Sequence, residues 1–174
     1  AIVDTLNKNS VSYVGGALSL VTGVAVHPNS GDPVAIGIES FNEIRFEPVL
    51  EGVFAEVRLA RWGTEETVVN LNPHTEGVHS LPPAERAKSV GDPRSIVFSS
   101  DGEEAWIASK GSNNVLVVDP SGQRMGDPIP VGFGSTGLAL TDEVAYVHNH
   151  FEGSLAVVDR STREVAVVVS LFDP

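Results

Sequence analysis

A repeat of about 40 residues in the C-terminal half constrains the fold of this chain more than any other feature of its sequence. Three segments within residues 96–119 recur, in the same order, within residues 138–159. Trp106 aligns with Tyr146 and Asp119 aligns with Asp159, each pair at the same spacing of about 40 positions. Three segments that stay in step over this distance are hard to produce by chance. Such a chain folds as repeated supersecondary units that cover one another's apolar faces.

Each repeat unit predicts three or four short strands joined by tight turns. The pair Asp101-Gly102 tolerates positive φ and therefore indicates a hairpin turn. Near-continuous runs of valine, isoleucine and leucine, such as residues 165–169, suit strands that are covered on both faces. Blades stacked around a ring provide that environment. The sequence therefore predicts an all-β fold, a partial β-propeller of about three to four four-stranded blades.

The repeat also predicts where each blade begins and ends. One blade is expected over residues 91–132 and another over residues 134–174. A more divergent blade precedes them over residues 22–88. Residues 1–21 are expected to contribute partial strands of a preceding blade.

The divergent blade is longer than the others, which indicates an insertion over residues 49–88. Residues 42–46 alternate apolar and charged side chains and are predicted to form its third strand. Within the insertion, residues 53–60 and 67–71 also have strand patterns, and we interpret them as additional strands.

Composition excludes several classes of function. The chain has 41% hydrophobic and 20% charged residues, which is typical of a globular protein, and its longest apolar stretches run about five or six residues, too short for a bilayer. A formal net charge of −12 would repel a nucleic acid duplex or an anionic membrane, so we expect neither nucleic acid binding nor membrane insertion. The absence of cysteine excludes disulfides, thiolate metal sites and covalently attached haem in this chain.

Residues 91–107 resemble the first half of a YVTN-type β-propeller repeat, which has a Gly-x-Pro entry, a strand, Ser-x-Asp-Gly and an aromatic-Val strand. Residues 113–119 resemble its second half, in which asparagines precede a strand that ends in Asp. The next unit departs from the pattern, because Ser135-Thr136-Gly137 replaces the entry and Thr141-Asp142-Glu143 lacks the glycine. The resemblance implies a propeller and no particular activity, since propellers include lactonases, dehydrogenases, adhesins and inert scaffolds.

A second resemblance is narrower. Residues 146–159, followed by residues 169–174, are similar to the last propeller repeat of bacterial proteins that continue into a c-type cytochrome domain of the di-haem peroxidase type. This resemblance implies an exported protein, periplasmic or at the cell surface, with haem c in an adjoining domain. The parent protein would then be a haem-dependent oxidoreductase. This chain itself is expected to hold no cofactor and no catalytic residue.

A partial propeller has two uncovered blades at its ends, so partners are expected. We expect the remainder of the same polypeptide, or another chain, to close the ring. The chain begins Ala1-Ile2-Val3 and is interpreted as a processed product or an internal piece. If the cytochrome resemblance holds, a redox protein is a further partner.

Two histidines form the most pointed candidate site. His148 and His150 lie on the same side of an extended strand, so they could share a metal with Glu152 or Asp142. The alternative is that these are loop residues at one end of the propeller, whose polar side chains hydrogen-bond to neighbouring blades.

The remaining chemistry-bearing residues have structural interpretations. The isolated histidines are interpreted as surface or capping residues, namely His27, His74 and His79. The acidic residues after the first repeat strand are interpreted as a solvated turn, namely Asp101, Glu103 and Glu104. Residues 132–137 are rich in glycine but lead into another strand, so we interpret them as a linker between blades. Trp62 and Trp106 are interpreted as core or blade-packing aromatics and not as platforms for a ligand.

These observations favour a non-catalytic scaffold or docking module, flanking a c-type cytochrome domain in an exported bacterial protein. One alternative is a hydrolase of the propeller-lactonase kind, with His148, His150, Glu152 and Arg94 at the channel mouth. The other alternative is a protein-binding repeat module at the cell surface.

Overall fold

The computed structural model describes residues 2–3, 11–41, 52–78 and 80–172. These residues form one two-stranded sheet, β1 (Ile2–Val3) with β2 (Val11–Ser12), and three four-stranded antiparallel sheets. We call the four-stranded sheets blades 1, 2 and 3. The strands of blade 1 are β3 (Leu20–Val26), β4 (Pro33–Ser40), β5 (Ala55–Trp62) and β6 (Glu66–Asn70). Those of blade 2 are β7 (Pro93–Phe98), β8 (Ala105–Ser109), β9 (Asn114–Val118) and β10 (Ile129–Pro130). Those of blade 3 are β11 (Ser135–Leu140), β12 (Val144–Asn149), β13 (Ser154–Asp159) and β14 (Glu164–Ser170).

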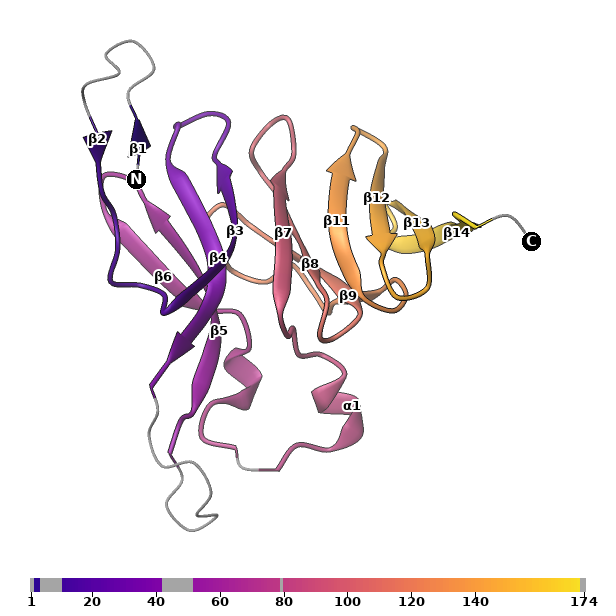
Figure 1. The fold of residues 1–174 in the computed structure, drawn as a ribbon, viewed down its shortest axis with the longest axis horizontal. Helices are drawn as coiled ribbons and strands as arrows, with labels where there is room; N and C mark the ends of the chain where they lie inside the picture. Colours follow the sequence, from indigo (N-terminus) through magenta and orange to yellow (C-terminus); the bar gives the residue numbers. More distant parts are fainter. Residues whose placement is uncertain (1, 4–10, 42–51, 79, 173–174) are drawn as a thin grey trace.

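The first strand of each blade lies innermost. In Figure 1, β3, β7 and β11 stand side by side, and β7 contacts both of the others. Within every blade the strands follow one another in sequence order from the first strand to the fourth. This is the arrangement of a partial β-propeller, so the predicted fold class is confirmed.

Two apolar layers hold the three blades together. The layer between blades 1 and 2 includes Ile36, Leu59 and Ile107. The layer between blades 2 and 3 includes Trp106 and Val147. Because blade 2 has a neighbour on each side, every residue of β8 and β9 is buried. This double coverage is the physical reason for the near-continuous apolar runs in the sequence.

The turn at Asp101-Gly102 is formed as predicted, with Gly102 at a φ of 78°. Residues 132–134 lead directly from β10 into β11, which confirms the interpretation of this glycine-rich segment as a linker between blades. β14 completes blade 3 as its fourth strand.

Blade 1 differs from its prediction in one respect. β5 and β6, which were interpreted as additional strands, are the third and fourth strands of the sheet. Leu59 of β5 pairs with Ile36 of β4 and faces blade 2. Because this alternate face of β5 is buried against blade 2, the register of β5 beside β4 is set. The predicted third strand at residues 42–46 lies outside the described residues.

A connector of residues 71–92 joins blade 1 to blade 2. It contains the 3₁₀ turn η1 (Pro73–Thr75) and the single-turn helix α1 (Pro83–Arg86), which lies at one end of the blades in Figure 1. None of the helices in the described ranges is long and apolar enough to cross a membrane.

Candidate functional site

The predicted histidine site is at the end of β12. The rings of His148 and His150 are 6.0 Å apart between centroids, in an edge-to-face arrangement. His148 Nδ1 lies 3.2 Å from Thr136 Oγ1, and Glu152 accepts a hydrogen bond of 3.1 Å from Ser154 Oγ. These contacts hold His148 and Glu152 against their own blade, whereas the loop interpretation expected hydrogen bonds to neighbouring blades.

The proposed third ligands are not brought together with the histidines. Asp142 precedes β12, at the opposite end of the strand from His148, and accepts a hydrogen bond of 3.1 Å from Ser100 in blade 2. In the described part of the chain, no three histidine, cysteine, aspartate or glutamate side chains are grouped closely enough to hold a metal ion.

The other histidines differ in their surroundings. His27 is buried, with 6% of its surface exposed, and its Nδ1 accepts a hydrogen bond from the amide of Ser30. It therefore caps a turn but is not a surface residue, because its ring packs edge-on against Phe98 at 5.1 Å. His74 belongs to the connector, and His79 lies outside the described residues.

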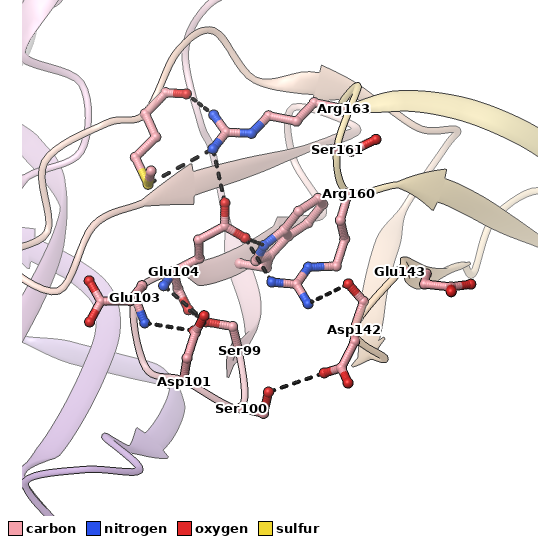
Figure 2. A network of polar contacts seen from close by, with 12 residues as sticks. Ser99, Ser100, Asp101, Glu103, Glu104, Asp142, Glu143, Arg160, Ser161 and Arg163 are labelled. Atoms are coloured by element: carbon pink, nitrogen blue, oxygen red, sulfur yellow. Dashed lines mark hydrogen bonds and ion pairs between the residues drawn. The ribbon is translucent and has the colours of Figure 1, made fainter.

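The densest polar cluster joins blades 2 and 3, and we call it the Glu104 junction (Figure 2). Glu104 accepts hydrogen bonds from Trp106 Nε1 at 3.0 Å, Arg160 Nη2 at 3.0 Å and Arg163 Nη2 at 3.1 Å. The second nitrogen of Arg160 donates to the carbonyl of Thr141 at 2.7 Å, and that of Arg163 donates to the carbonyl of Met125. One carboxylate thus binds a buried indole of its own blade and two guanidinium groups of the next blade.

The electrostatics of the junction favour the ionised carboxylate. Partial burial acts to raise the pKa of Glu104, but the hydrogen bonds from Trp106, Arg160 and Arg163 outweigh it, so the pKa lies below its ordinary value of 4.5. The Glu104 side chain is 19% exposed and that of Arg160 is 14% exposed. The interpretation of Glu104 as part of a solvated turn is therefore wrong, because its carboxylate is enclosed by the next blade.

Two aspartates cap equivalent turns in successive blades. Asp119 Oδ1 accepts hydrogen bonds from the amides of Ser121 and Gln123, each at 2.9 Å, and from Ser121 Oγ at 2.7 Å. Asp159 Oδ1 accepts the equivalent bonds from the amide and hydroxyl of Ser161. Partial burial acts to raise the pKa of Asp119, but these hydrogen bonds outweigh it and hold the pKa below its ordinary value of 3.8.

These turns predict a loss of stability in acid. A carboxyl whose pKa is lower in the folded chain stabilises the fold fully above the pKa of the unfolded chain, and this contribution is lost as the pH falls below about 4. We expect Asp119→Asn to reduce the slope of unfolding free energy against pH below about pH 4, and Ser121→Ala to reduce it less. Urea unfolding at a series of pH values measures the slopes. Equal slopes for all three proteins would contradict the prediction.

A second polar cluster fixes the connector against blade 2. Arg124 donates to the carbonyl of Lys88 at 2.7 Å and contacts His74 Nδ1 at 3.2 Å. Within the connector, Asn72 forms a reciprocal pair of hydrogen bonds with the backbone of Val90, each 2.8 Å long. Burial first, and then the charge of Arg124, lower the pKa of His74. Neutral His74 suits this position, because its unprotonated Nδ1 faces the guanidinium.

Among the described residues, the outermost face of blade 3 and part of the outermost face of blade 1 expose apolar side chains. The blade 1 end face turns away from blade 2 and exposes Val24 and Val26, at 72% and 63%. The blade 3 end face turns away from blade 2 and exposes Tyr146, Val167 and Val169, at 37%, 49% and 46%. Apolar side chains at these levels of exposure, grouped on one sheet face, indicate a surface that packs against another chain segment.

An apolar groove of about 520 Å³ lies on the blade 1 end face. Its walls come from β3 to β5 and from the N-terminal segment, and include Val24, Val26, Trp62, Ile2 and Val14. Trp62 Nε1 is buried there and has no hydrogen-bond partner among the described residues.

Sequence reasoning identified Trp106 and missed the polar residues that surround it. Trp106 is fully buried between blades, as predicted. Arg160 and Arg163 were not singled out, although the four-residue turn that carries them follows the capping aspartate of a repeat unit. The signal that could have found Glu104 is its position two residues before Trp106, which places both side chains on the same face of the strand.

Comparison with known proteins identifies the fold and not the family. No protein family model matches this chain, and no curated protein matches it. Hydrazine synthase from Kuenenia stuttgartiensis is similar in structure, with a TM-score of 0.62 and 13% identity over 83% of this chain and 46% of that one. A functionally unknown protein from Desulfotomaculum acetoxidans has a TM-score of 0.61 and 13% identity, over 94% of this chain and 46% of that one.

A chain of a nidogen/laminin complex is also similar, with a TM-score of 0.54 and 11% identity over 88% of this chain and 48% of that one. At these identities the likeness extends to the fold alone. The chain spans less than half the length of each of these three structures.

Proposed function

We propose that this chain is a non-catalytic propeller module that serves as a scaffold or docking surface. The observation that carries the proposal is the Glu104 junction, where the most concentrated set of charged groups is engaged in joining blades 2 and 3. A catalytic carboxylate needs an oxygen that is free to act on a substrate, whereas both oxygens of Glu104 accept hydrogen bonds from an indole or a guanidinium group. Exposed apolar side chains lie on both end faces, which suits a protein that binds other chains.

The parent protein is proposed to be an exported bacterial protein, periplasmic or at the cell surface, with a c-type cytochrome domain adjoining this module. The resemblance of residues 146–159 and 169–174 to propellers that continue into such a domain supports this part of the proposal. Haem c would then belong to the adjoining domain, and a redox protein would be a partner of the whole. The resemblance of residues 91–119 to YVTN-type repeats supports the propeller fold of the module.

The end faces are proposed to be covered by further blades, from the same polypeptide or from another chain. Sheets in propellers are covered on both faces by their neighbours, and blades 1 and 3 each have one neighbour in this chain.

Hydrolysis by the lactonase-type set is not favoured by the contacts of its members. Arg94 pairs at 2.9 Å with Asp92, which directly precedes β7, and Glu152 accepts a hydrogen bond of 3.1 Å from Ser154. A cell-surface binding module would also use the end faces to bind other chains. It differs from the scaffold proposal because it predicts no haem in the parent protein.

The mass of the native polypeptide tests the haem-linked part of the proposal. We expect denaturing mass spectrometry of the protein from its source cells to give a mass well above 18.3 kDa, with increments that match covalent haem. Tryptic peptides that cover residues 95–124 identify the polypeptide whose mass is measured. A polypeptide of larger mass without haem would contradict the cytochrome link and favour the surface-binding module.

A further inference from the structure

The connector between blades 1 and 2 is anchored at its two ends. Leu71 and Val90 are buried in the apolar layer between these blades. The reciprocal hydrogen bonds between Asn72 and Val90 close the base of the loop. Residues 73–78 and 80–89, which we call the projecting segment, include η1 and α1 at one end of the blades (Figure 1). None of these described residues is buried, so polar contacts and not apolar packing decide where the segment lies.

One side chain of blade 2 holds the connector at three points. Arg124, which forms a β-bridge with Val118, donates to the carbonyl of Leu71 at 3.4 Å. It also donates to the carbonyl of Lys88 at 2.7 Å, and its Nη1 lies 3.2 Å from Nδ1 of His74. A single guanidinium thus contacts the start of the connector, η1 and the residues that follow α1.

The blades reach the projecting segment through two other side chains as well. Asn70 donates to Glu76 at 3.1 Å on the surface of the molecule. Asn114 donates to the carbonyl of Ser89 at 3.0 Å, beside the anchored end. Neither of these contacts involves η1 or α1, so Arg124 is the main link between those two turns and blade 2.

His74 makes its contact with Arg124 in one protonation state only. A guanidinium has donors and no acceptor, so Nδ1 of His74 must accept and carries no proton. The proton of the neutral ring is then on Nε2, which lies 3.0 Å from Ser89 Oγ and donates to it. A second proton on Nδ1 would remove the acceptor and place a positive charge directly against the guanidinium.

The charged groups around His74 come from both sides of this contact. Arg124 and Lys88 disfavour a proton on the ring, whereas Glu85 and Asp127 favour it. Glu85 is paired with Lys88 at 3.1 Å, so these two charges largely offset each other. Burial of the ring is the largest influence, followed by the charge of Arg124, and together they lower the pKa of His74 below its ordinary value of 6.5.

We propose that the connector is a pH-sensitive strap, in which protonation of His74 in weakly acidic solution releases the projecting segment from Arg124. The anchors at Asn72 and Val90 keep both ends in place, and the blades remain stacked because His74 lies outside the apolar layer between them. The strap is therefore fixed to blade 2 in neutral solution and mobile in weakly acidic solution.

The direction of the effect follows from proton binding. The fixed strap binds a proton at His74 less readily than the released strap, because the pKa is lowered only when Arg124 is in contact. Attachment is therefore complete well above pH 6.5 and weakens as the pH falls below that value. One proton can change the attachment equilibrium by at most about tenfold per pH unit. This window lies above the range below about pH 4 in which the aspartate turns lose their contribution.

A nitroxide spin label on α1 measures the release. The chain has no cysteine, so Ala84→Cys on the exposed side of α1 provides a single labelling site. We expect the ratio of mobile to immobile label to rise about 3- to 10-fold between about pH 7.5 and about pH 5.5. The control label is at Thr162→Cys, in an exposed turn of blade 3, and its spectrum should be the same at both pH values. An unchanged ratio at position 84 overturns the proposal.

Two histidine variants, each combined with the label at position 84, identify the group that takes up the proton. In His74→Asn the amide oxygen can accept from Arg124 in place of Nδ1 but does not titrate, so we expect no change with pH. His150→Gln removes an exposed histidine at the end of β12 and should keep the full response. A full response in His74→Asn means that another group releases the strap, which overturns the proposal.

Nuclear magnetic resonance of the unsubstituted chain gives a test that does not depend on variants. The ring signals of His74 should titrate with a midpoint below 6.5, and the amide signals of residues 83–88 should change with the same midpoint. A midpoint at or above 6.5, or amide signals that do not follow the ring, contradicts the strap.

Discussion

Replacing Trp106 with alanine is expected to lower the free energy of unfolding by about 4 kcal/mol. The indole is fully buried in the apolar layer between blades 2 and 3, and it is the largest of the fully buried side chains. Its removal leaves a cavity that neighbouring sheets cannot fill, and also frees one oxygen of Glu104 from its hydrogen bond. Urea unfolding followed by far-ultraviolet circular dichroism measures the change, since the substitution alters the fluorescence signal.

Trp106→Phe is the matched variant for this prediction. It keeps an aromatic ring between the blades but removes the N–H that donates to Glu104, so its cost should be about half as large. A loss of less than about 1 kcal/mol in Trp106→Ala would mean that the layer between blades 2 and 3 contributes little to stability.

Replacing Glu104 with alanine is expected to lower the free energy of unfolding by about 3 kcal/mol. The change leaves Trp106 Nε1 buried without an acceptor and leaves two guanidinium groups, of Arg160 and Arg163, without their shared carboxylate. The loss should be smaller than for a fully buried ion pair, because the Arg163 side chain is 28% exposed. Glu104→Gln keeps an acceptor for the indole and should therefore cost less than Glu104→Ala.

The adjacent Glu103 provides the control for this prediction. It has the same charge and is exposed, so Glu103→Ala should change the unfolding free energy by no more than about 0.5 kcal/mol. Equal effects of Glu103→Ala and Glu104→Ala would show that net charge, and not the junction, is responsible.

The parts of the fold that the sequence predicts well are those where local pattern and burial agree. Blades 2 and 3 follow the 40-residue repeat, and the burial of Trp106 follows from its place in a strand covered on both sides. In blade 1, two successive segments have strand patterns, residues 42–46 and residues 53–60. Alternation alone cannot decide which of them pairs with β4. The decision depends on the packing of Leu59 against blade 2, which is a tertiary contact.

The Glu104 junction could not be derived from sequence spacing. Arg160 and Arg163 are 56 and 59 positions away from Glu104, and they meet it because the turn after β13 lies beside the start of β8 once the blades stack. The same holds for Arg124, whose acceptor at Lys88 is 36 positions away. Motif reasoning looks for short, fixed spacings, whereas contacts between blades depend on how the sheets pack.

Every blade is formed from one uninterrupted stretch of chain, with its strands in sequence order from the inside outward. Each sheet can therefore pair completely as soon as its own last strand has left the ribosome, without waiting for a strand from the distant end of the polypeptide. The topology therefore allows blade 2 to form on blade 1, and blade 3 on blade 2, in the order in which they are synthesised. A nascent chain that assembles in this order would expose one incomplete sheet at a time.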